Sequence, residues 1–258
     1  MSLEERPLSG SGENVKPLHL GLKPHLRGLL GWGIRRIRSS PDPANDPLDP
    51  VSGIQECVPA SPVGSPANPS STLEQQAEKV AVCQQCDLCH SRILTAFGVG
   101  DPAADLMFVG GSPDAEEDRS GEPFGGPAGQ LLDRIIGALG LSRDRVYITN
   151  VLKCHPPENR DPLPQELVAC LGHLEAQIAR VDPVMIVALG RPAAGWLTGQ
   201  ETSLAKMRGQ KHLWRGIPLV ATYHPAFLIQ QPEYKAHCWQ DLQRVIEVLQ
   251  RTPARPRS

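Results

Sequence analysis

In the stretch Asp105-Leu-Met-Phe-Val-Gly-Gly-Ser-Pro113, four apolar residues lead directly into a tight polar turn. The apolar run Leu106–Val109 has the length of a β-strand, and no polar residue alternates within it. Such a strand is buried on both faces, which is typical of a parallel sheet covered by helices. This segment therefore predicts an α/β core.

Further apolar runs of strand length lie on its C-terminal side and alternate with helical segments. The strands are expected at Val146–Thr149, Val184–Leu189 and Pro218–Thr222. A capping-box sequence, Ser71-Thr-Leu-Glu74, predicts a helix that runs to Val80. Other helices are expected at Gln130–Leu139, Gln165–Arg180, Pro192–Leu197 and Glu233–Gln250. The alternation predicts a three-layer α/β/α fold with a central four-stranded parallel sheet.

The composition changes near residue 71. The first 70 residues hold 11 of the 26 prolines, and Trp32 is their only aromatic residue. Such a segment cannot bury enough apolar surface to offset the cost of ordering its backbone. We therefore expect a disordered extension at 1–70, one domain at 71–252 and a disordered tail at 253–258. The basic segment Lys23–Arg38 is interpreted as part of the solvated extension, although it can also form a short amphipathic helix.

The net charge, the hydropathy pattern and the cysteine content indicate possible binding partners and the cellular compartment of the protein. The formal net charge is -2, so any DNA-binding surface must be local. No run of about 18 apolar residues predicts a membrane span, and no apolar region follows a basic N-terminus as in a secretory signal. We expect a cytoplasmic protein, whose seven cysteines serve as free thiols or metal ligands.

Four of these cysteines have the spacing of a metal site. Cys83-Gln-Gln-Cys86 can hold one side of a metal centre, and Cys154 and Cys170 can close it from a distant segment. Four thiolates bind either zinc or an iron–sulfur cluster, and the spacing alone leaves both open. Cys89 is a possible substitute ligand, but a structural role is the better interpretation.

Polar turns follow all four predicted strands. They are Gly110–Asp114, Asn150, Gly190-Arg191 and Tyr223-His-Pro225. In open parallel sheets, ligands bind outside the carboxyl ends of the strands. Each turn alone is weak evidence, but together they predict a composite pocket at one edge of the sheet.

Four longer motifs lie in this part of the chain. They are Gly110-Gly-Ser-Pro-Asp-Ala-Glu-Glu-Asp118, Pro123-Phe-Gly-Gly-Pro-Ala-Gly-Gln-Leu-Leu132, Tyr147-Ile-Thr-Asn-Val-Leu-Lys-Cys-His-Pro-Pro-Glu-Asn-Arg160 and Tyr223-His-Pro-Ala-Phe-Leu228. Together with the cysteine spacing, these motifs resemble a known family, the iron–sulfur (family 4) uracil-DNA glycosylases, and the resemblance covers residues from about Cys83 to about Gln250. It implies a monofunctional hydrolase that releases uracil from DNA in base excision repair. It also implies a [4Fe-4S] cluster on Cys83, Cys86, Cys154 and Cys170.

The resemblance also implies roles for the residues that bind uracil. Phe124 would stack on a base that has left the duplex, and Asn150 would present its amide to the uracil edge. His224 would donate a hydrogen bond to the base oxygen on which charge develops. Ser112 is expected to complete the uracil site. For Phe124 and His224 taken alone, a structural role is the competing interpretation.

The first motif departs from the family pattern Gly-Glu-x-Pro-Gly. Gly111 stands where the family has glutamate, and Asp114 where it has the final glycine. A carboxylate at this place can position water and offset positive charge on the sugar. We expect Glu117 to supply it, with Asp114 as the second candidate. The competing interpretation is that this acidic run only begins a solvated helix.

DNA contacts are expected from two segments. Lys206, Arg208 and Lys211 lie in one basic loop suited to phosphates, although such a run is often only a charged loop. Phe227 and Leu228 resemble an apolar wedge that fills the gap left by a flipped base, but they can equally pack in the core. We expect a monomer that acts on DNA containing uracil.

Two alternatives to a uracil glycosylase stay open at this point. The chain can be a glycosylase-fold iron–sulfur protein that binds DNA or damaged bases with weakened cleavage, which Gly111 and Asp114 favour. It can also be a glycosylase for another deaminated base. An electron carrier has little support, because it would not need Phe124, Asn150 and His224 at strand ends.

Overall fold

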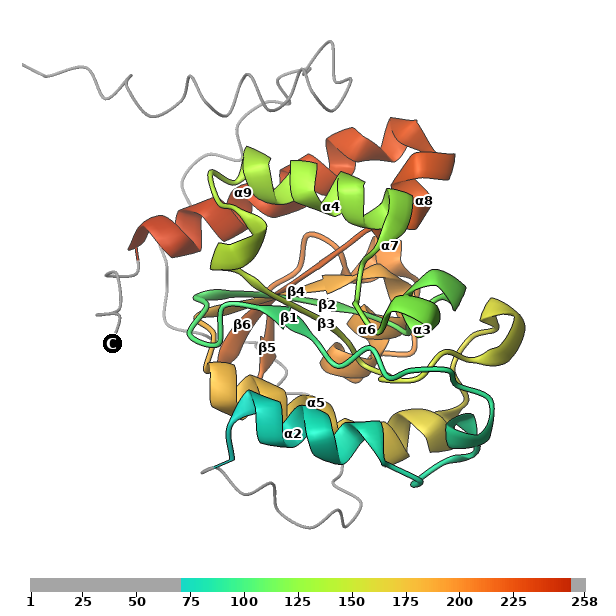
Figure 1. Ribbon diagram of the computed structural model, residues 1–258. Coiled ribbons are helices and arrows are strands. Elements are labelled where there is room, and N and C mark those ends of the chain that lie inside the picture. Colours follow the sequence, from blue (N-terminus) through green and yellow to red (C-terminus); the bar gives the residue numbers. More distant parts are fainter. Residues whose placement is uncertain (1–70, 252–258) are drawn as a thin grey trace, which may run out of the picture.

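A computed structural model describes residues 71–251. The expected extension at 1–70, its basic segment Lys23–Arg38 and the tail at 253–258 lie outside the described residues. Within the described range the chain forms a sheet with helices on both faces (Figure 1). The α/β class and the three layers agree with the sequence prediction.

The sheet has six strands in the order β1-β3-β2-β4-β6-β5. The four inner strands β3, β2, β4 and β6 pair in parallel, as predicted. The prediction of a four-stranded sheet is wrong, however, because β1 and β5 add antiparallel edges. The strands are β1 (Val99–Gly100), β2 (Leu106–Gly110), β3 (Tyr147–Asn150), β4 (Met185–Leu189), β5 (His212–Trp214) and β6 (Ile217–Thr222).

The two edge strands have no strong sequence signal. β1 is two residues long, and β5 is three residues long and follows the basic loop. A short edge strand carries neither a continuous apolar run nor a long alternation, so periodicity does not reveal it. Short edges also limit unwanted pairing with other chains.

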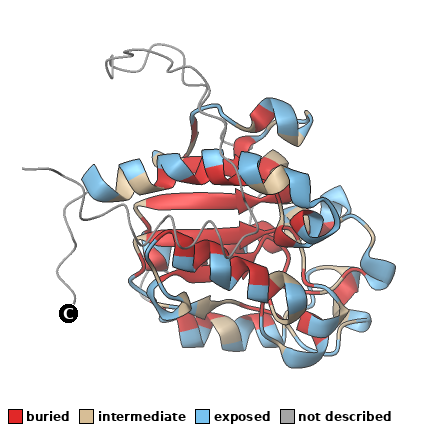
Figure 2. Cartoon of the chain, turned by 90° about the horizontal axis from the view of Figure 1, so that it is seen from above, coloured by how far each residue is buried: buried red, intermediate tan, exposed pale blue. Residues whose placement is uncertain are grey.

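Helices cover each face of the sheet and bury their apolar sides against it (Figure 2). Residues of α4, α8 and α9 pack on one face, and residues of α2, α5 and α6 pack on the other. The α-helices are α2 (Leu73–Ala81), α3 (Ala115–Ser120), α4 (Gly126–Ala138), α5 (Pro164–Val181), α6 (Gly190–Thr198), α7 (Leu204–Met207), α8 (Pro225–Gln230) and α9 (Lys235–Arg251). Short 3-10 turns lie at Asp87–His90, Arg143–Arg145, Pro157–Asn159 and Pro232–Tyr234.

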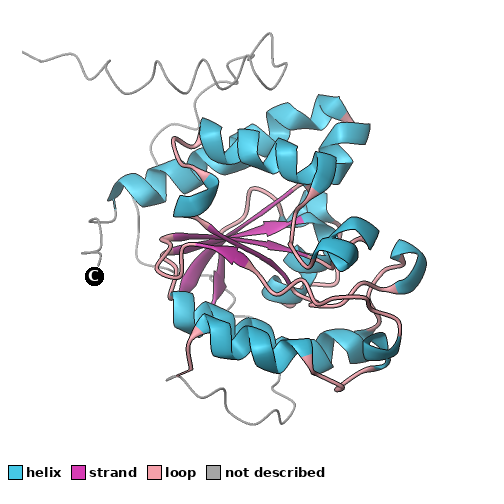
Figure 3. Cartoon of the chain, viewed as in Figure 1, coloured by secondary structure: helices cyan, strands magenta, loops and turns pink. Residues whose placement is uncertain are grey.

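The register of the parallel strands aligns their carboxyl ends. Gly110 at the end of β2 pairs with Asn150 at the end of β3, and Leu189 of β4 pairs with Thr222 of β6. The loops that follow these strands therefore emerge at one edge of the sheet (Figure 3). Within residues 71–251, no helix has the length and apolar character needed to span a membrane.

Candidate active site at the strand ends

The side chains of Asn150, at the end of β3, and Phe124, in the loop between α3 and α4, both lie at the end of β2. A Cβ atom built on Gly110 would lie 2.1 Å from Asn150 Oδ1 and 2.7 Å from Phe124 Cζ. Both distances are too short for any side chain, so only glycine leaves room for these groups. The structure thus brings together Phe124 and Asn150, two residues that the sequence assigns to uracil binding.

The Asn150 amide is buried without a hydrogen-bond partner. Asn150 is 1% exposed, and neither its Oδ1 nor its Nδ2 makes a hydrogen bond of ordinary geometry among the described residues, although its side chain lies close enough to the Glu117 carboxylate to lower the pKa of that group. An unsatisfied buried polar group costs about 1–3 kcal/mol, and native structures seldom retain one without a reason. A ligand edge that both donates and accepts a hydrogen bond would satisfy this amide.

Phe124 is held in a strained backbone conformation. Its φ angle is 54°, in the left-handed region that is uncommon for residues other than glycine. The Phe124 backbone N–H donates a hydrogen bond to Glu117 Oε1. The ring is buried and faces His224, with ring centroids 5.2 Å apart and planes at 31°. The Glu117 carboxylate therefore helps to fix the position of the Phe124 ring.

Glu117 and Asp114 form a reciprocal cap at the start of α3. Asp114 Oδ1 accepts from the backbone N–H groups of Glu116 and Glu117, at 2.8 and 2.9 Å. In return, Glu117 Oε2 accepts from the Asp114 N–H at 2.7 Å. Asp114 is exposed, whereas Glu117 is only 5% exposed. Burial raises the pKa of Glu117 to about 7, against the lowering effect of its backbone donors.

His224 presents one ring nitrogen away from the backbone. Its Nδ1 accepts the Ala226 N–H at 3.2 Å at the start of α8, so a neutral ring carries its proton on Nε2. Burial lowers the pKa of His224 to about 4, although nearby Asp114 acts in the opposite direction. At neutral pH the imidazole is thus an uncharged donor. Gly190 has a φ angle of 86°, and a Cβ atom built on it would lie 3.1 Å from His224 Cβ. The lack of a side chain at Gly190 therefore lets the backbone approach His224 closely.

Gly111, where the first motif lacks the family's glutamate, is closely packed. Gly111 is buried, and a Cβ atom there would lie 3.1 Å from Pro192 Cβ. A side chain at Gly111 therefore requires a small shift of Pro192. Ser112, also expected at the uracil site, is partly exposed in the loop between β2 and α3.

The four cysteines predicted as metal ligands line one cavity. Cys83 and Cys86 follow α2, Cys154 follows β3, and Cys170 lies in α5. Other lining residues include Arg92, Lys153 and His173, whereas Cys89 is not among them. Among the described residues, no group of three or more potential ligands is arranged to hold a single metal ion.

The surroundings of these thiols suit a soft metal centre. Arg92 donates to Cys154 Sγ at 3.3 Å, and His173 Nε2 lies 3.3 Å from Cys83 Sγ. Hydrogen bonds to sulfur are a usual feature of iron–sulfur sites. Burial raises the pKa of Cys170 to about 12, and nearby Lys153 opposes this effect. A bound metal would displace the thiol protons.

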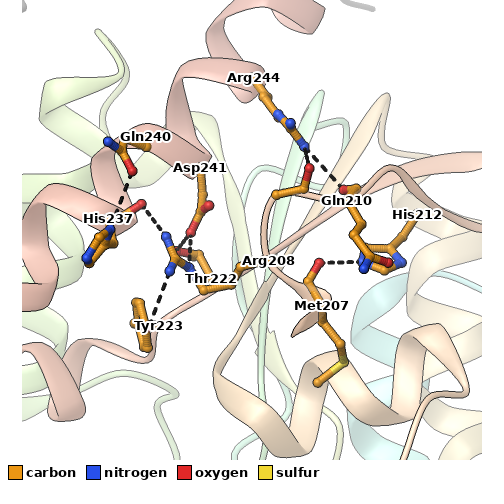
Figure 4. Close-up of polar contacts among 11 residues, drawn as sticks. Met207, Arg208, Gln210, His212, Thr222, Tyr223, His237, Gln240, Asp241 and Arg244 are labelled. Atoms are coloured by element: carbon orange, nitrogen blue, oxygen red, sulfur yellow. Dashed lines mark hydrogen bonds and ion pairs between the residues drawn. The ribbon is translucent and has the colours of Figure 1, made fainter. Parts of the chain in front are cut away.

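The basic loop is fastened to α9 by an arginine (Figure 4). Arg208 Nε donates to Asp241 at 2.6 Å, and its other nitrogens donate to the Tyr223 hydroxyl and the His237 carbonyl. Its guanidinium also lies over the Tyr223 ring, 4.4 Å from the centroid. These contacts hold Arg208 against α9 and Tyr223, and its expected contact with a phosphate stays a prediction. Lys206 and Lys211 are exposed.

The two residues of the expected wedge have different environments. Phe227 is 36% exposed and stacks on Tyr223, with centroids 5.2 Å apart. Leu228 is 0% exposed and belongs to the core beneath α8. Helical periodicity turns the Leu228 side chain toward the core, and its expected contact with DNA stays a prediction.

The sequence interpretation missed Lys153. This lysine is fully buried and donates hydrogen bonds to the Asn150 carbonyl and the Thr149 hydroxyl. A signal was present, because Lys153 stands between the predicted uracil-binding residue Asn150 and the predicted ligand Cys154. Its burial, however, depends on tertiary packing that a single sequence does not reveal.

Comparison with known proteins identifies the class. A family model described as the uracil DNA glycosylase superfamily matches residues 97–243. The chain is 39% identical over 186 residues to a type-4 uracil-DNA glycosylase of Sulfurisphaera tokodaii, a match that spans 69% of this chain and 84% of the relative. For the type-4 enzymes of Archaeoglobus fulgidus and Thermotoga maritima, identity is 36% over 185 residues and 40% over 160 residues. These matches span 69% and 61% of this chain, and 93% and 83% of the relatives.

The α/β fold and the family match define a member of the uracil-DNA glycosylase superfamily. Within it, the chain belongs to the type-4 uracil-DNA glycosylase family, which confirms the resemblance found in the sequence.

The buried Glu117 carboxylate predicts a specific pH dependence of stability. Its pKa rises from an ordinary 4.5 to about 7 on folding, so the folded protein binds more protons between these values. Raising the pH from 4.5 to 7 should therefore destabilise the wild type relative to Glu117→Gln by about 3 kcal/mol. Urea denaturation at a series of pH values measures this difference. Glu116→Gln, on the same helix but exposed, is the control and should follow the wild type. Parallel pH profiles for Glu117→Gln and the wild type would contradict the assignment.

Proposed function

We propose that this chain hydrolyses the N-glycosidic bond of uracil in DNA and leaves an abasic site, as the first step of base excision repair. The observation that carries the proposal is the unpartnered Asn150 amide, buried beside the Phe124 ring at the end of the parallel strands. The family membership supports the same activity, because its relatives are named uracil-DNA glycosylases.

The target base has to leave the duplex before it can enter such a pocket, since its glycosidic bond is inaccessible within the stack. Phe124 would then stack on the flipped base. The Asn150 amide would donate to one uracil group and accept from another. Cytosine presents the reverse pattern at that edge, so a fixed amide orientation discriminates against it.

Cleavage of the glycosidic bond leaves negative charge on the departing uracil and positive charge on the sugar. His224 is suited to the first of these charges and Glu117 to the second. Uracil departs with negative charge, and the neutral His224 can donate its Nε2 proton in a hydrogen bond to the base oxygen. The sugar develops positive charge and is attacked by water. The water oxygen bonds to the sugar carbon, the bond from that carbon to the base nitrogen breaks, and a water proton is released.

Glu117 is the first candidate for positioning this water. It is buried beside the pocket, and its pKa of about 7 suits a group that accepts a proton near neutral pH. Both of its oxygens already accept a backbone N–H, which fixes the carboxylate and leaves further acceptor capacity. Asp114 remains the second candidate. Its exposed carboxylate caps α3 and so has a structural duty of its own.

The proposal includes a [4Fe-4S] cluster on Cys83, Cys86, Cys154 and Cys170. Four sulfur donors in one cavity, with hydrogen bonds to two of them, support this assignment. The cluster would brace the segment after α2 against α5 and supply no redox step, because glycosidic hydrolysis needs none.

Lys206, Lys211 and Phe227 are proposed to contact DNA. We further propose a monofunctional, monomeric and cytoplasmic enzyme.

Measuring uracil release by the wild type and by the variant Asn150→Ala tests the proposal directly. Anaerobically purified protein should contain about four iron atoms per chain. It should also make single- or double-stranded oligonucleotides alkali-sensitive at uracil. Asn150→Ala should reduce this release at least 100-fold, because hydrogen bonds at a buried recognition site are costly to lose. Gln243→Ala, which removes an exposed amide on α9, is the matched control and should retain wild-type activity. Full activity of Asn150→Ala would contradict the assigned pocket.

Gly111 favours one alternative, a glycosylase fold that binds DNA or damaged bases with weakened cleavage. Gly111→Glu restores the family's carboxylate, with a small shift of Pro192 to accommodate its Cβ. If Glu117 supplies the needed carboxylate, this variant should change uracil release less than about tenfold. A gain of several orders of magnitude would show that the chain had lost part of its machinery. The same assay with hypoxanthine in place of uracil tests a different deaminated base.

A further inference from the structure

The buried lysine Lys153 touches the backbone of the residue that presents the unpartnered amide. Its Nζ donates to the Asn150 carbonyl oxygen at 2.5 Å and to Thr149 Oγ1 at 2.7 Å. Lys153 is 0% exposed, so water does not compete for these donors. A charged donor in such surroundings makes a stronger hydrogen bond than a neutral one.

Thr149 joins Lys153 to a wider buried network. The Thr149 hydroxyl donates to the Phe97 carbonyl at 2.6 Å, and Gln177 Nε2 donates to the same carbonyl at 2.8 Å. Lys153, Thr149 and Gln177 are all fully buried. Buried polar networks whose members are satisfied hold a single local geometry. These three buried side chains thus fix the end of β3, and none of them is a predicted uracil-binding residue.

Two of the predicted metal ligands are also neighbours of Lys153. Lys153 lines the cysteine cavity together with Cys154 and Cys170. Burial lowers the pKa of Lys153 to about 7, and the electrostatic interactions with Cys170 and Cys154 oppose this effect. A buried cation is costly unless negative charge compensates it. Four metal-bound thiolates would supply such charge. Lys153 therefore lies between the two sites of this protein, in contact with both.

Arg92 provides a contrast within the same cavity. It also carries a positive charge beside a ligand sulfur, 3.3 Å from Cys154 Sγ. Its other hydrogen bond, however, goes to the Ala81 carbonyl at the end of α2. Arg92 thus shares the charge and the cavity with Lys153 but not the contact with Asn150.

We propose that Lys153 is a positioning residue for uracil recognition: its ammonium, held between the thiolates and the Asn150 carbonyl, fixes the strand end that carries the Asn150 amide. This inference rests on the proposed function. Removing the ammonium should let the end of β3 relax and should misplace the amide relative to Phe124. The exposed groups proposed to bind DNA do not contact Lys153. Its removal should therefore lower the affinity for the uracil base and leave the affinity for the DNA backbone unchanged.

The test compares Lys153→Met, Lys153→Gln and Arg92→Met with the wild type, all as full-length iron-containing protein. Uracil release is normalised to bound iron, free uracil affinity is measured by calorimetry, and affinity for a uracil-free oligonucleotide is measured by anisotropy. Lys153→Met should lose about 10- to 100-fold in both uracil affinity and release per iron-loaded molecule. Its affinity for uracil-free DNA should match that of the wild type. Lys153→Gln keeps a shorter neutral donor and should recover part of the loss.

Arg92→Met distinguishes positioning from a general effect of charge near the thiolates. It should lower iron content at most, with uracil affinity per iron-loaded molecule unchanged. An equal loss in Arg92→Met, or wild-type uracil affinity in both Lys153 variants, would overturn the proposal. If the wild type binds free uracil but releases none from DNA, the proposed function fails. In that case, weaker uracil binding confined to the Lys153 variants would still support the positioning role.

Discussion

The site depends on the missing side chain at Gly110. β2 ends there, in register with the end of β3, and the space that a Cβ would fill is taken by Asn150 Oδ1 and the Phe124 ring. An amide from one strand and an aromatic ring from a distant loop can meet only because the strand between them carries no side chain at this point. The parallel register, set by the continuous apolar strands, places this gap at the edge where ligands bind.

Electrostatics on the two sides of this gap serve different purposes. On the pocket side, burial keeps His224 neutral and raises the pKa of Glu117, so that the first is a donor and the second an acceptor near pH 7. Glu117 also holds the strained backbone of Phe124, so the carboxylate proposed to position water fixes the ring proposed to stack on the base. On the far side, Lys153 links Asn150 to the cysteine cavity. Lys153 thus connects the cysteine cavity to the strand end that carries the Asn150 amide.

The sequence predicted what local patterns can encode. Leu106–Val109 and the other apolar runs predicted the four parallel strands. The turns after the strands predicted Asn150 and His224 as site residues, and the family resemblance predicted Phe124. The sequence did not predict β1 and β5, which are too short to carry a periodic signal. It also did not predict interactions between distant residues. Asp241, 33 residues from Arg208, occupies the guanidinium that was expected to bind phosphate, and only packing shows that Leu228 faces inward and that Lys153 is buried.

The most direct measurement of the central claim is the affinity of Gly110→Ala for free uracil, determined by calorimetry on iron-loaded protein. The added methyl group would overlap Asn150 Oδ1 and the Phe124 ring, so uracil binding should fall at least 100-fold while iron content stays at the wild-type level. Gly137→Ala, on α4 where a Cβ meets nothing within 4 Å, is the matched control and should bind uracil as the wild type does. Unchanged uracil affinity in Gly110→Ala would show that the base binds elsewhere and would contradict the account.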